Sequence, residues 1–315
     1  MLDHYAAFHL ACLSPVLREW VGDAAIFASA RAHLLEEIAE RGSLTDSIRA
    51  YAEACAIPGA EPAEYAMREV PLRCGAGVLA QIHYYGLNRE RPYVGIRAQT
   101  RPLFQDEVFD ACAELADEFE VFEPKCVRLR SPQGASDFDL LPGVQADLRI
   151  YAGPLEELRA RPLPNHFDRI RLVAQEPDEY YDEYCETYDE FARATPELNE
   201  RVARESLASL RACHECGACF RVAVDGEAAG VIAARPEHTD GLEGWVVIEE
   251  ILAAPFRGRG LGAALQRHLI EVLDDERFPL LTGTIDALNE PSMRTARRVG
   301  REDVGGWSFV PTRFA

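Results

Sequence analysis

The fold of the C-terminal half is decided by residues 249–262, which read Glu249-Glu250-Ile251-Leu252-Ala253-Ala254-Pro255-Phe256-Arg257-Gly258-Arg259-Gly260-Leu261-Gly262. An apolar strand ends at Pro255, a glycine-rich turn follows, and a helix begins directly after the turn. Glycine has no Cβ, so the backbone of such a turn can approach a ligand closely. The free N–H groups at a helix N-terminus carry partial positive charge, and Arg257 and Arg259 add charged donors that match phosphate geometry. The stretch therefore predicts a site for a pyrophosphate group.

The elements around this stretch are expected to form an α/β domain, with strands and helices following one another in a definite order. The expected strands are residues 170–173, 220–224, 229–234, 245–254, 280–286 and 307–310, and the expected helices are residues 180–195, 198–212, 263–273 and 291–299. Asp225-Gly226 predicts a hairpin turn, because glycine tolerates the positive φ of tight turns. Gly300 predicts the end of the last helix.

A domain boundary is expected near the middle of the chain. Three prolines and a glycine fall within residues 153–165, and proline removes backbone donors and restricts the residue before it to extended conformations. We predict an N-terminal α/β domain at residues 1–152, a linker at residues 153–165 and a second domain at residues 166–315. The length of 315 residues agrees with two domains.

The first half echoes the order of elements in the second. Its expected helices are residues 15–41, 46–55 and 105–119, and its expected strands are residues 69–74, 77–85, 93–99 and 126–130. The turn before the third helix reads Thr100-Arg101-Pro102-Leu103-Phe104 and has no glycine. If this half shares the fold, it has therefore lost the means to bind a phosphate through its backbone. We favour a degenerate copy of the second half over an unrelated α/β domain.

The composition restricts the partners and the compartment. The chain has 33 lysines and arginines against 53 aspartates and glutamates, which gives a net charge of −20. The electric field of such a negatively charged protein repels nucleic acids and anionic lipid surfaces, and it favours a cationic substrate. No apolar stretch is long enough for a membrane helix, the N-terminus lacks the features of a secretory signal, and the nine cysteines indicate reduced thiols rather than a disulfide framework. We therefore expect a cytoplasmic protein with no nucleic-acid or membrane partner.

Two motifs resemble those of the GNAT N-acetyltransferase superfamily. The pattern Arg-x-x-Gly-x-Gly, formed by Arg257, Gly260 and Gly262 after a strand, resembles the acetyl-CoA motif of that family. The segment from Asp286 through Asn289 to Gly300 resembles its second cofactor element, in which an asparagine at a strand end precedes a short helix and a glycine. The resemblance covers the second half of the chain. It implies a GNAT fold with a mixed, mainly antiparallel sheet flanked by helices, acetyl-CoA as the acyl donor, direct transfer to an amine, and no metal.

The same resemblance implies three sets of cofactor contacts. The backbone around Ile251, Leu252 and Ala253 is expected to pair with the pantetheine arm. The N–H groups of the turn and of the helix start are expected to hold the pyrophosphate; these residues are Gly258, Arg259, Gly260, Leu261, Gly262 and Ala263, with Arg257 alongside. Asn289 and Ser292 are expected to line the far side of the cofactor.

The catalytic groups are less fully defined by the motifs. Glu249 and Glu250 are the candidate bases, and only one of them can face the acceptor because successive strand residues face opposite sides; we slightly prefer Glu250. Only one residue separates Pro255 from Arg257, where the family usually has two, and a bulge expected in this strand would absorb the difference. Many family members carry a tyrosine as general acid where this chain has Ala296. The family also often has Gly-Phe where this chain has Gly300-Arg301.

The expected reaction is acetyl transfer to a primary amine of a small molecule, such as an amino acid, a polyamine or an amino sugar antibiotic. Two alternatives stay open: a non-enzymatic acyl-CoA sensor, and an acetyltransferase acting on a protein N-terminus or lysine. The chain is expected to be a homodimer or a tandem-domain monomer.

Other candidate sites have simpler interpretations. Cys213, Cys216 and Cys219 have metal-ligand spacing, but we favour packed or redox-sensitive thiols over a metal site. An aromatic stripe at helical spacing comprises Tyr180, Tyr181, Tyr184, Tyr188 and Phe191; we favour rings in the core over a cation-binding wall. His268 is expected at the edge of the core, and His83 is a candidate only if the first half lines the acceptor site.

Overall fold

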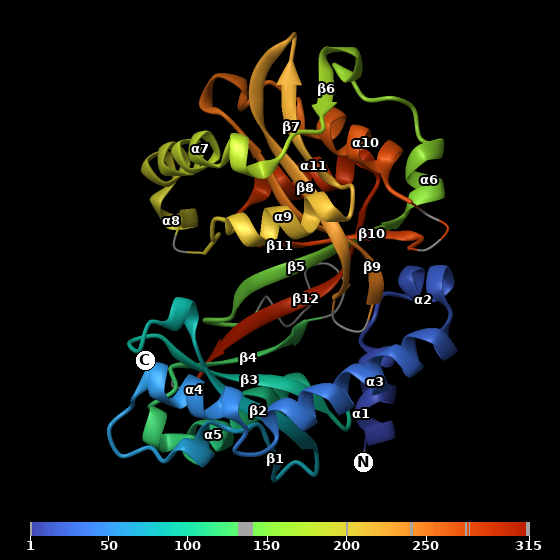
Figure 1. Cartoon of the computed structure of the whole chain (residues 1–315). Helices are drawn as coiled ribbons and strands as arrows, with labels where there is room; N and C mark the ends of the chain where they lie inside the picture. The colour runs from blue at the N-terminus through green and yellow to red at the C-terminus, as the bar shows by residue number, and fades with distance from the viewer. Residues whose placement is uncertain are drawn as a thin grey trace. The chain divides into compact units, whose positions relative to one another are not determined.

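The computed structural model describes residues 2–131, 141–199, 201–239, 242–274, 276 and 278–312. The chain divides into two compact units, one formed by Met1–Leu148 with Val304–Ala315 and the other by Arg149–Asp303. Both are built from a mainly antiparallel sheet with helices packed against it (Figure 1). The mixed α/β class predicted from the sequence is confirmed.

The second unit has the strand order β5–β10–β9–β8–β7–β6, with β11 paired to β5. The strands are β5 (Gln145–Pro154), β6 (Ile170–Val173), β7 (Cys219–Val224), β8 (Glu227–Thr239), β9 (Leu242–Leu252), β10 (Leu280–Thr282) and β11 (Thr284–Asp286). The helices are α6 (Leu155–Ala160), α7 (Tyr181–Ala194), α8 (Pro196–Asn199), α9 (Leu207–Glu215), α10 (Gly262–Val272) and α11 (Glu290–Val299). Successive pairs from β6 to β9 are antiparallel, and β9 and β10 are parallel.

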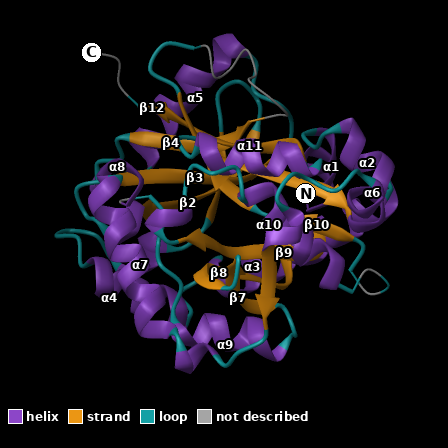
Figure 2. Cartoon of the chain, turned by 90° about the horizontal axis from the view of Figure 1, so that it is seen from above, coloured by secondary structure: helices purple, strands orange, loops and turns teal. Residues whose placement is uncertain are grey.

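Helices cover both faces of this sheet, which gives the unit two apolar clusters. On one face α7 and α9 bury Tyr184 and Leu210 against Val231. On the other face α10 buries Leu265 and Leu269, which lie one helical turn apart. Figure 2 shows α9 and α10 on opposite sides of β8 and β9. A side chain of β9 therefore faces either α7 or α10, according to its parity along the strand.

Strand β9 has an irregularity on each edge. Against β8, Val247 pairs with Ala234 but Glu249 pairs with Ala233, so Ile248 is the extra residue of a bulge. This bulge is the one expected from the sequence. Against β10 the register consists of Leu281↔Trp245 and Thr282↔Val246, and the chain then continues into β11, which pairs with β5 instead. The two parallel strands thus part directly after Val246.

The first unit has the strand order β1–β2–β3–β4–β12. Its strands are β1 (Arg68–Pro71), β2 (Gly77–Tyr84), β3 (Pro92–Gln99), β4 (Cys126–Ser131) and β12 (Glu302–Pro311), and its helices are α1 (Leu2–Ala11), α2 (Pro15–Val21), α3 (Asp23–Arg41), α4 (Asp46–Cys55) and α5 (Gln105–Glu118). Helices α4 and α5 pack on one face of the sheet and bury residues such as Ile48 and Leu115. None of the described helices, in either unit, has the length and apolarity needed to cross a membrane.

The first unit repeats the topology of the second. In each, three antiparallel strands are followed by a helix and then by a strand parallel to the third: β1-β2-β3-α5-β4 in one and β7-β8-β9-α10-β10 in the other. The third strand is bulged in both, with Arg97 the extra residue of β3, since Leu79 pairs with Ala98 and Ala80 with Ile96. This shared order supports the interpretation of the first half as a degenerate copy.

The boundary between the units differs from the predicted linker at residues 153–165. Gly153 and Pro154 end strand β5, where they pair with Leu281 and Leu280, and residues 155–160 form α6. Proline is tolerated there because it occupies the last position of the strand. The C-terminal strand also differs from prediction: Gly306–Pro311 pair with β4, so Val304–Ala315 belong to the first unit and not to the second.

Three expected elements are interrupted. The helix at residues 15–41 is two helices separated by Gly22, whose φ of 86° is not helical. The helix at residues 198–212 is replaced by α8 and α9, and the Ser206 side chain caps α9 by accepting the N–H of Ser209 (3.1 Å). The strand at residues 280–286 is broken at Gly283, where the chain changes partner from β9 to β5. Strand β5 and helices α1 and α6 are missed by the sequence patterns.

The pairing of β12 with β4 can be tested with Val310, which is fully buried in the core of the first unit. We expect Val310→Asp to lower the free energy of unfolding by several kcal/mol, because it buries an unpaired charge. Amide hydrogen exchange in β4 should accelerate at the same time. Val173→Asp is the matched control, since Val173 lies on strand β6 and is 42% exposed. Unchanged exchange in β4 would show that the C-terminal strand does not complete this sheet.

Candidate functional site

The turn between β9 and α10 presents a row of free backbone N–H groups. Gly258 and Gly260 have φ of 71° and 76°, a conformation that favours glycine, and each faces open space. The first N–H group of the helix with a carbonyl partner is that of Leu265, which donates to Leu261 O (2.9 Å). In the described part of the chain, the N–H groups from Gly258 to Ala264 have no hydrogen-bond acceptor. The first turn of α10 also has no acidic residue and no capping side chain, so this helix end can accept an anion.

Helix α5, the counterpart in the first unit, is closed in the same place. Its N-cap residue Phe104 donates its N–H to the Glu107 carboxylate (2.9 Å), and Arg101 binds both oxygens of that carboxylate (2.8 Å each). The hydrogen bonds from Arg101 lower the pKa of Glu107 to about 2. The helix end thus carries its own anion, with an arginine to balance it. A phosphate group would meet the negative charge of this carboxylate there.

The two arginines of the turn have different surroundings. Arg257 is half-buried: its Nε donates to Leu252 O (2.5 Å), one Nη donates to Thr187 O (3.2 Å), and the guanidinium lies over the ring of Phe191. It therefore fastens the turn to β9 and α7. Arg259 is exposed and lies near the ring of Phe256 (5.7 Å). Its charge is the one that remains available at the turn.

The helix starts of α10 and α11 meet at Gly262. A Cβ on Gly262 would lie 2.7 Å from Thr295 Oγ1 on α11, so any larger residue would separate the two helices. Asn289 caps α11, where its Oδ1 accepts the N–H of Ser292 (3.3 Å). Both residues are half-buried. The hydrogen bond between Asn289 and Ser292 therefore caps the start of α11.

The three residues predicted to pair with a pantetheine arm lie at the end of β9. Ile251 and Leu252 pair with Val231 and Gly230 of β8, and the N–H of Ala253 donates to Ala229 O (2.8 Å). Leu252 O accepts from Arg257, as described above. On the β8 side, the backbone groups of this segment are thus already hydrogen-bonded within the protein. On the other side, β9 is no longer paired with β10 after Val246, so that edge of the strand is left for a ligand.

Glu249 faces α7 and is 4% exposed. Its two carboxylate oxygens accept hydrogen bonds from the hydroxyls of Tyr184 and Tyr188 (3.2 Å for Tyr188), and Tyr184 in turn accepts the N–H of Glu205 (2.9 Å). Burial raises the pKa of Glu249 to about 7, and the tyrosine hydrogen bonds act in the opposite direction. No cation is bonded to this carboxylate among the described residues. Tyr184 also lines a small pocket with Thr187 and Ile251.

Glu250 faces the opposite side, toward α10. Its carboxylate accepts a hydrogen bond from Gln266 Nε2 (2.5 Å), and Gln266 is bonded through its oxygen to Arg301 (3.4 Å). Burial raises the pKa of Glu250 to about 7, while the Arg301 charge opposes this rise. Arg301 is 2% exposed, and burial lowers the pKa of its guanidinium to about 10. Glu250 thus belongs to a buried polar network with its own counter-cation.

Two residues explain departures noted in the sequence. Ala296, at the position of the family tyrosine, is fully buried against the ring of Tyr151 from β5. Arg301 follows Gly300, which ends α11, and donates to the backbone oxygen of Tyr151 (2.8 Å). Tyr151 escaped prediction because it directly precedes the segment interpreted as a linker.

The remaining candidates occupy structural positions. Tyr180, Tyr184 and Tyr188 are buried in the core, as favoured from the sequence. Cys213 and Cys219 are buried, and Cys219 lies 3.2 Å from the Tyr180 hydroxyl, whereas Cys216 is exposed. Within the described residues no group of three or more His, Cys, Asp or Glu side chains could hold a metal ion. His268 stacks on Phe167 (3.9 Å) and bonds to its carbonyl oxygen (2.8 Å).

Residues 178–300 match the model of the acetyltransferase (GNAT) family. Among solved structures, the chain is similar to a GCN5-related N-acetyltransferase from Sphaerobacter thermophilus, with 14% identity over 85% of this chain and 91% of that one and a TM-score of 0.47. It is also similar to a tandem GNAT protein from the clavulanic acid biosynthesis pathway, with 14% identity over 87% of this chain and 98% of that one and a TM-score of 0.47. No curated protein matched the chain.

The raised pKa of Glu249 predicts a pH-dependent stability. Between its ordinary pKa of 4.5 and its folded pKa of about 7, the folded chain binds more protons at this group than the unfolded chain. The free energy of unfolding therefore falls as the pH rises through that window. Glu249→Gln should remove this loss, so that the variant gains stability relative to the parent from pH 5 to pH 8, by about 3 kcal/mol at most.

Urea unfolding over this pH range measures the effect. Glu186→Gln is the control, because Glu186 is an exposed glutamate of α7. A difference between Glu249→Gln and the parent that stays constant with pH would mean that Glu249 is ionised throughout.

Proposed function

We propose, on the premise that residues 178–300 form a domain of the acetyltransferase (GNAT) family, that the chain transfers the acetyl group of acetyl-CoA directly to a primary amine of a small molecule. The family supports an acyl-CoA-dependent acetyltransferase in general. The amine acceptor and the residue roles below are part of the proposal.

The observation that carries the proposal is the contrast between the two helix starts. The turn before α10 has free N–H groups from Gly258 to Ala264, two glycines at positive φ, and an exposed Arg259. The start of α5 has the same place in the fold but is closed by Glu107 and Arg101. The same order of elements occurs in both units, and of the two described helix starts the one before α10 is suited to a pyrophosphate, which supports the proposal.

The donor would be held by residues of this second copy. The backbone of the turn and of the helix start would bind the pyrophosphate, with Arg259 adding charge, and the edge of β9 at residues 251–253 would pair with the pantetheine arm. Arg257 would act by holding the turn to β9 and α7. Asn289 and Ser292 would set the start of α11 beside the cofactor. The bound donor supplies a thioester, and an amine would attack its carbonyl carbon once that amine is neutral. The C–N bond forms, the C–S bond breaks, the extra amine proton goes to the base, and CoA leaves as a thiolate that takes a proton from water.

We assign the base to Glu249, which reverses the slight preference for Glu250 drawn from the sequence patterns. Glu250 has a fixed partner in Gln266 and a cation in Arg301 behind it. Glu249 is held only by neutral donors, and its pKa of about 7 suits the removal of a proton near neutral pH. Tyr184 lines the adjacent pocket, and its hydroxyl donates to Glu249. Its own proton would move to the carboxylate as its oxygen takes the proton of the amine.

The acceptor class rests on charge. The chain carries a net charge of −20, and α7 exposes acids next to Tyr184. Glu183 is paired with Arg221 and Asp189 with Arg204, while Asp182, Glu186 and Glu190 add negative charge to the same helix. A protonated amine is attracted to such a surface before it is deprotonated. The alternatives are a sensor that binds acyl-CoA without turnover and an enzyme that acts on protein amines.

Donor binding can be tested at Gly260. Gly260→Val should abolish acetyl-CoA binding in calorimetry, because a β-branched side chain opposes the positive φ and crowds the free N–H groups. Gly217→Val is the matched control, since Gly217 has a φ of 74° and also faces open space. Both variants should lose similar stability, but only the first should lose affinity. Equal affinity of the two variants would refute the pyrophosphate assignment.

Catalysis can be tested with the two glutamates. In a thiol-release assay with a panel of amines, Glu249→Gln should lower kcat by about 100-fold or more at pH 8, and the loss should shrink below pH 7, where Glu249 of the parent is itself protonated. Glu250→Gln should have a smaller effect that does not depend on pH. The opposite order would return the role of base to Glu250. Donor binding without turnover on any amine or peptide would favour the sensor.

A further inference from the structure

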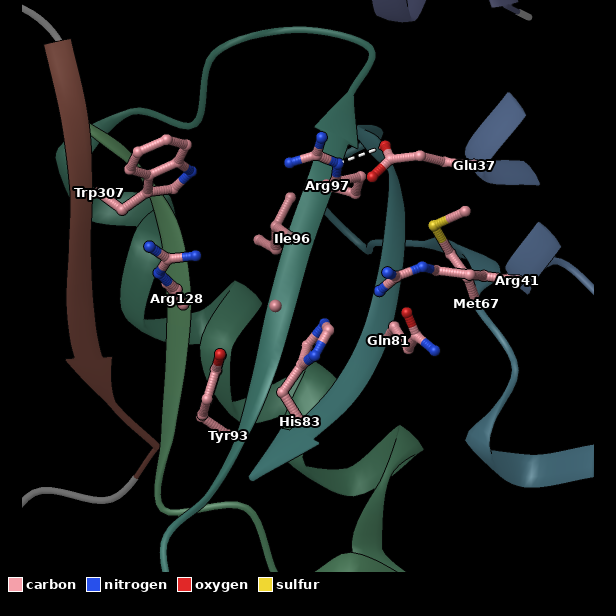
Figure 3. Close-up of a pocket in the computed structure, with 11 residues that line it drawn as sticks. Glu37, Arg41, Met67, Gln81, His83, Tyr93, Ile96, Arg97, Arg128 and Trp307 are labelled. Atoms are coloured by element: carbon pink, nitrogen blue, oxygen red, sulfur yellow. Dashed lines mark hydrogen bonds and ion pairs between the residues drawn. The ribbon is translucent and has the colours of Figure 1, made fainter. Parts of the chain in front are cut away.

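The first unit contains a cavity of about 210 Å³ on the face of its sheet opposite α4 and α5 (Figure 3). Side chains of β2, β3, β4 and β12 form its floor, and α3 contributes Glu37 and Arg41. On the strands the wall residues alternate with core residues, as His83 and Arg128 do with Ile82 and Val127. This face is thus largely polar, although Ile96 both lines the cavity and belongs to the apolar core of the unit.

The cavity lies where the third strand of the repeat parts from the fourth. Strands β3 and β4 are paired through Tyr93, Val94 and Gly95, with Gly95 opposite Arg128. The next residues of β3, Ile96 and the bulged Arg97, line the cavity together with Gly95. In the second unit the strands β9 and β10 part at the corresponding point. The cavity therefore occupies, within its own unit, the position at which the second copy opens its sheet.

The charges around the cavity leave one positive charge in excess. Arg97 is bonded to Glu37, and Arg128 is bonded to Asp147 (2.7 Å). Arg41 also lines the cavity, and no hydrogen bond or ion pair of its side chain occurs in the part of the chain that the structure describes. Three guanidinium groups thus face two carboxylates, although the whole chain has a net charge of −20. A ligand with a single negative charge would balance this excess.

The other walls are neutral and largely flat. The rings of His83 and Tyr93 stack at 5.3 Å, and the Trp307 ring lies below the Arg128 guanidinium at 4.7 Å. Burial, and the charges of Arg41, Arg128 and Arg97, lower the pKa of His83 to about 3, so this ring is neutral at physiological pH. Met67 adds an apolar side chain to the same cavity (Figure 3).

The geometry points to a second ligand site: we propose that this cavity binds a small monocarboxylate with an apolar or aromatic body. Arg41 would hold the carboxylate, and His83, Tyr93 and Trp307 would contact the body. The start of α5, where a phosphate would bind in this unit, carries the Glu107 carboxylate. That negative charge disfavours a coenzyme that bears phosphate groups. This site is independent of the acetyl-CoA site proposed for the second unit.

Three probes of one shape and different charge test the proposal on the full-length chain. Benzoate, benzamide and benzamidine carry charges of −1, 0 and +1 on the same ring. In calorimetry with saturating CoA present, benzoate should bind with one-to-one stoichiometry, benzamide at least about 10-fold more weakly, and benzamidine not at all. Similar binding of all three, or no saturable binding of benzoate, would overturn the proposal.

Variants then locate the site. Arg41→Gln should weaken benzoate binding at least about 10-fold, and Arg41→Lys should retain part of the affinity because it keeps the charge. Arg73→Gln is the control, since the Arg73 side chain is 81% exposed in the same unit. Circular dichroism and thermal unfolding confirm that each variant is folded. Benzoate binding that Arg41→Gln leaves unchanged would show that the carboxylate binds elsewhere and would overturn the assignment.

Discussion

Strand β9 is paired with β8 along its whole length but with β10 at only two positions, and the second unit is organised around this difference. The parting of β9 from β10 leaves one strand edge for a ligand. The same strand leads directly into the turn at Arg257–Gly262, so the open edge and the free N–H groups of α10 follow one another along the chain. The bulge at Ile248 lies at the start of this open segment and sets which side chains face α7.

The two helices at corresponding places in the two units begin in different ways. Helices α5 and α10 both follow a bulged strand and precede a parallel one. In α10 the start is held open by glycines at positive φ, whereas in α5 the N3 glutamate folds back onto the N-cap and is neutralised by an arginine. An internal carboxylate thus takes the N-cap N–H of α5 and places a negative charge at that helix start, whereas no acidic side chain lies in the first turn of α10. The first copy retains a cavity of a different chemistry, with arginines and rings in place of a phosphate cradle.

Glu249 and Glu250 illustrate how neighbouring residues acquire different properties. Burial raises both pKa values to about 7. The groups around them are of different kinds: tyrosine hydroxyls on the α7 side, and a glutamine and a buried arginine on the α10 side. The charge of Arg301 opposes the rise in the pKa of Glu250, whereas the side chains that oppose the rise at Glu249 are neutral tyrosines. Arg301 is part of this division.

Sequence patterns were enough to predict several local elements of the second unit. These are strand β9, the glycine turn after it, helix α10, the hairpin at Asp225-Gly226 and the end of α11 at Gly300. These features depend on short-range physics, namely apolar periodicity and the conformational freedom of glycine. The repeated order of elements also favoured a degenerate copy in the first half.

The strand partners, the domain boundary and the surroundings of the glutamates could not be predicted in this way, because they depend on residues far apart in the chain. Strand β12 joins β4 across more than half of the sequence, Gly153-Pro154 ends a strand instead of forming a linker, and the surroundings of Glu249 come from Tyr184 and Tyr188 on a distant helix. Side-chain burial and long-range pairing leave no local signal, and they are what distinguish the two glutamates and form the cavity beside Arg41.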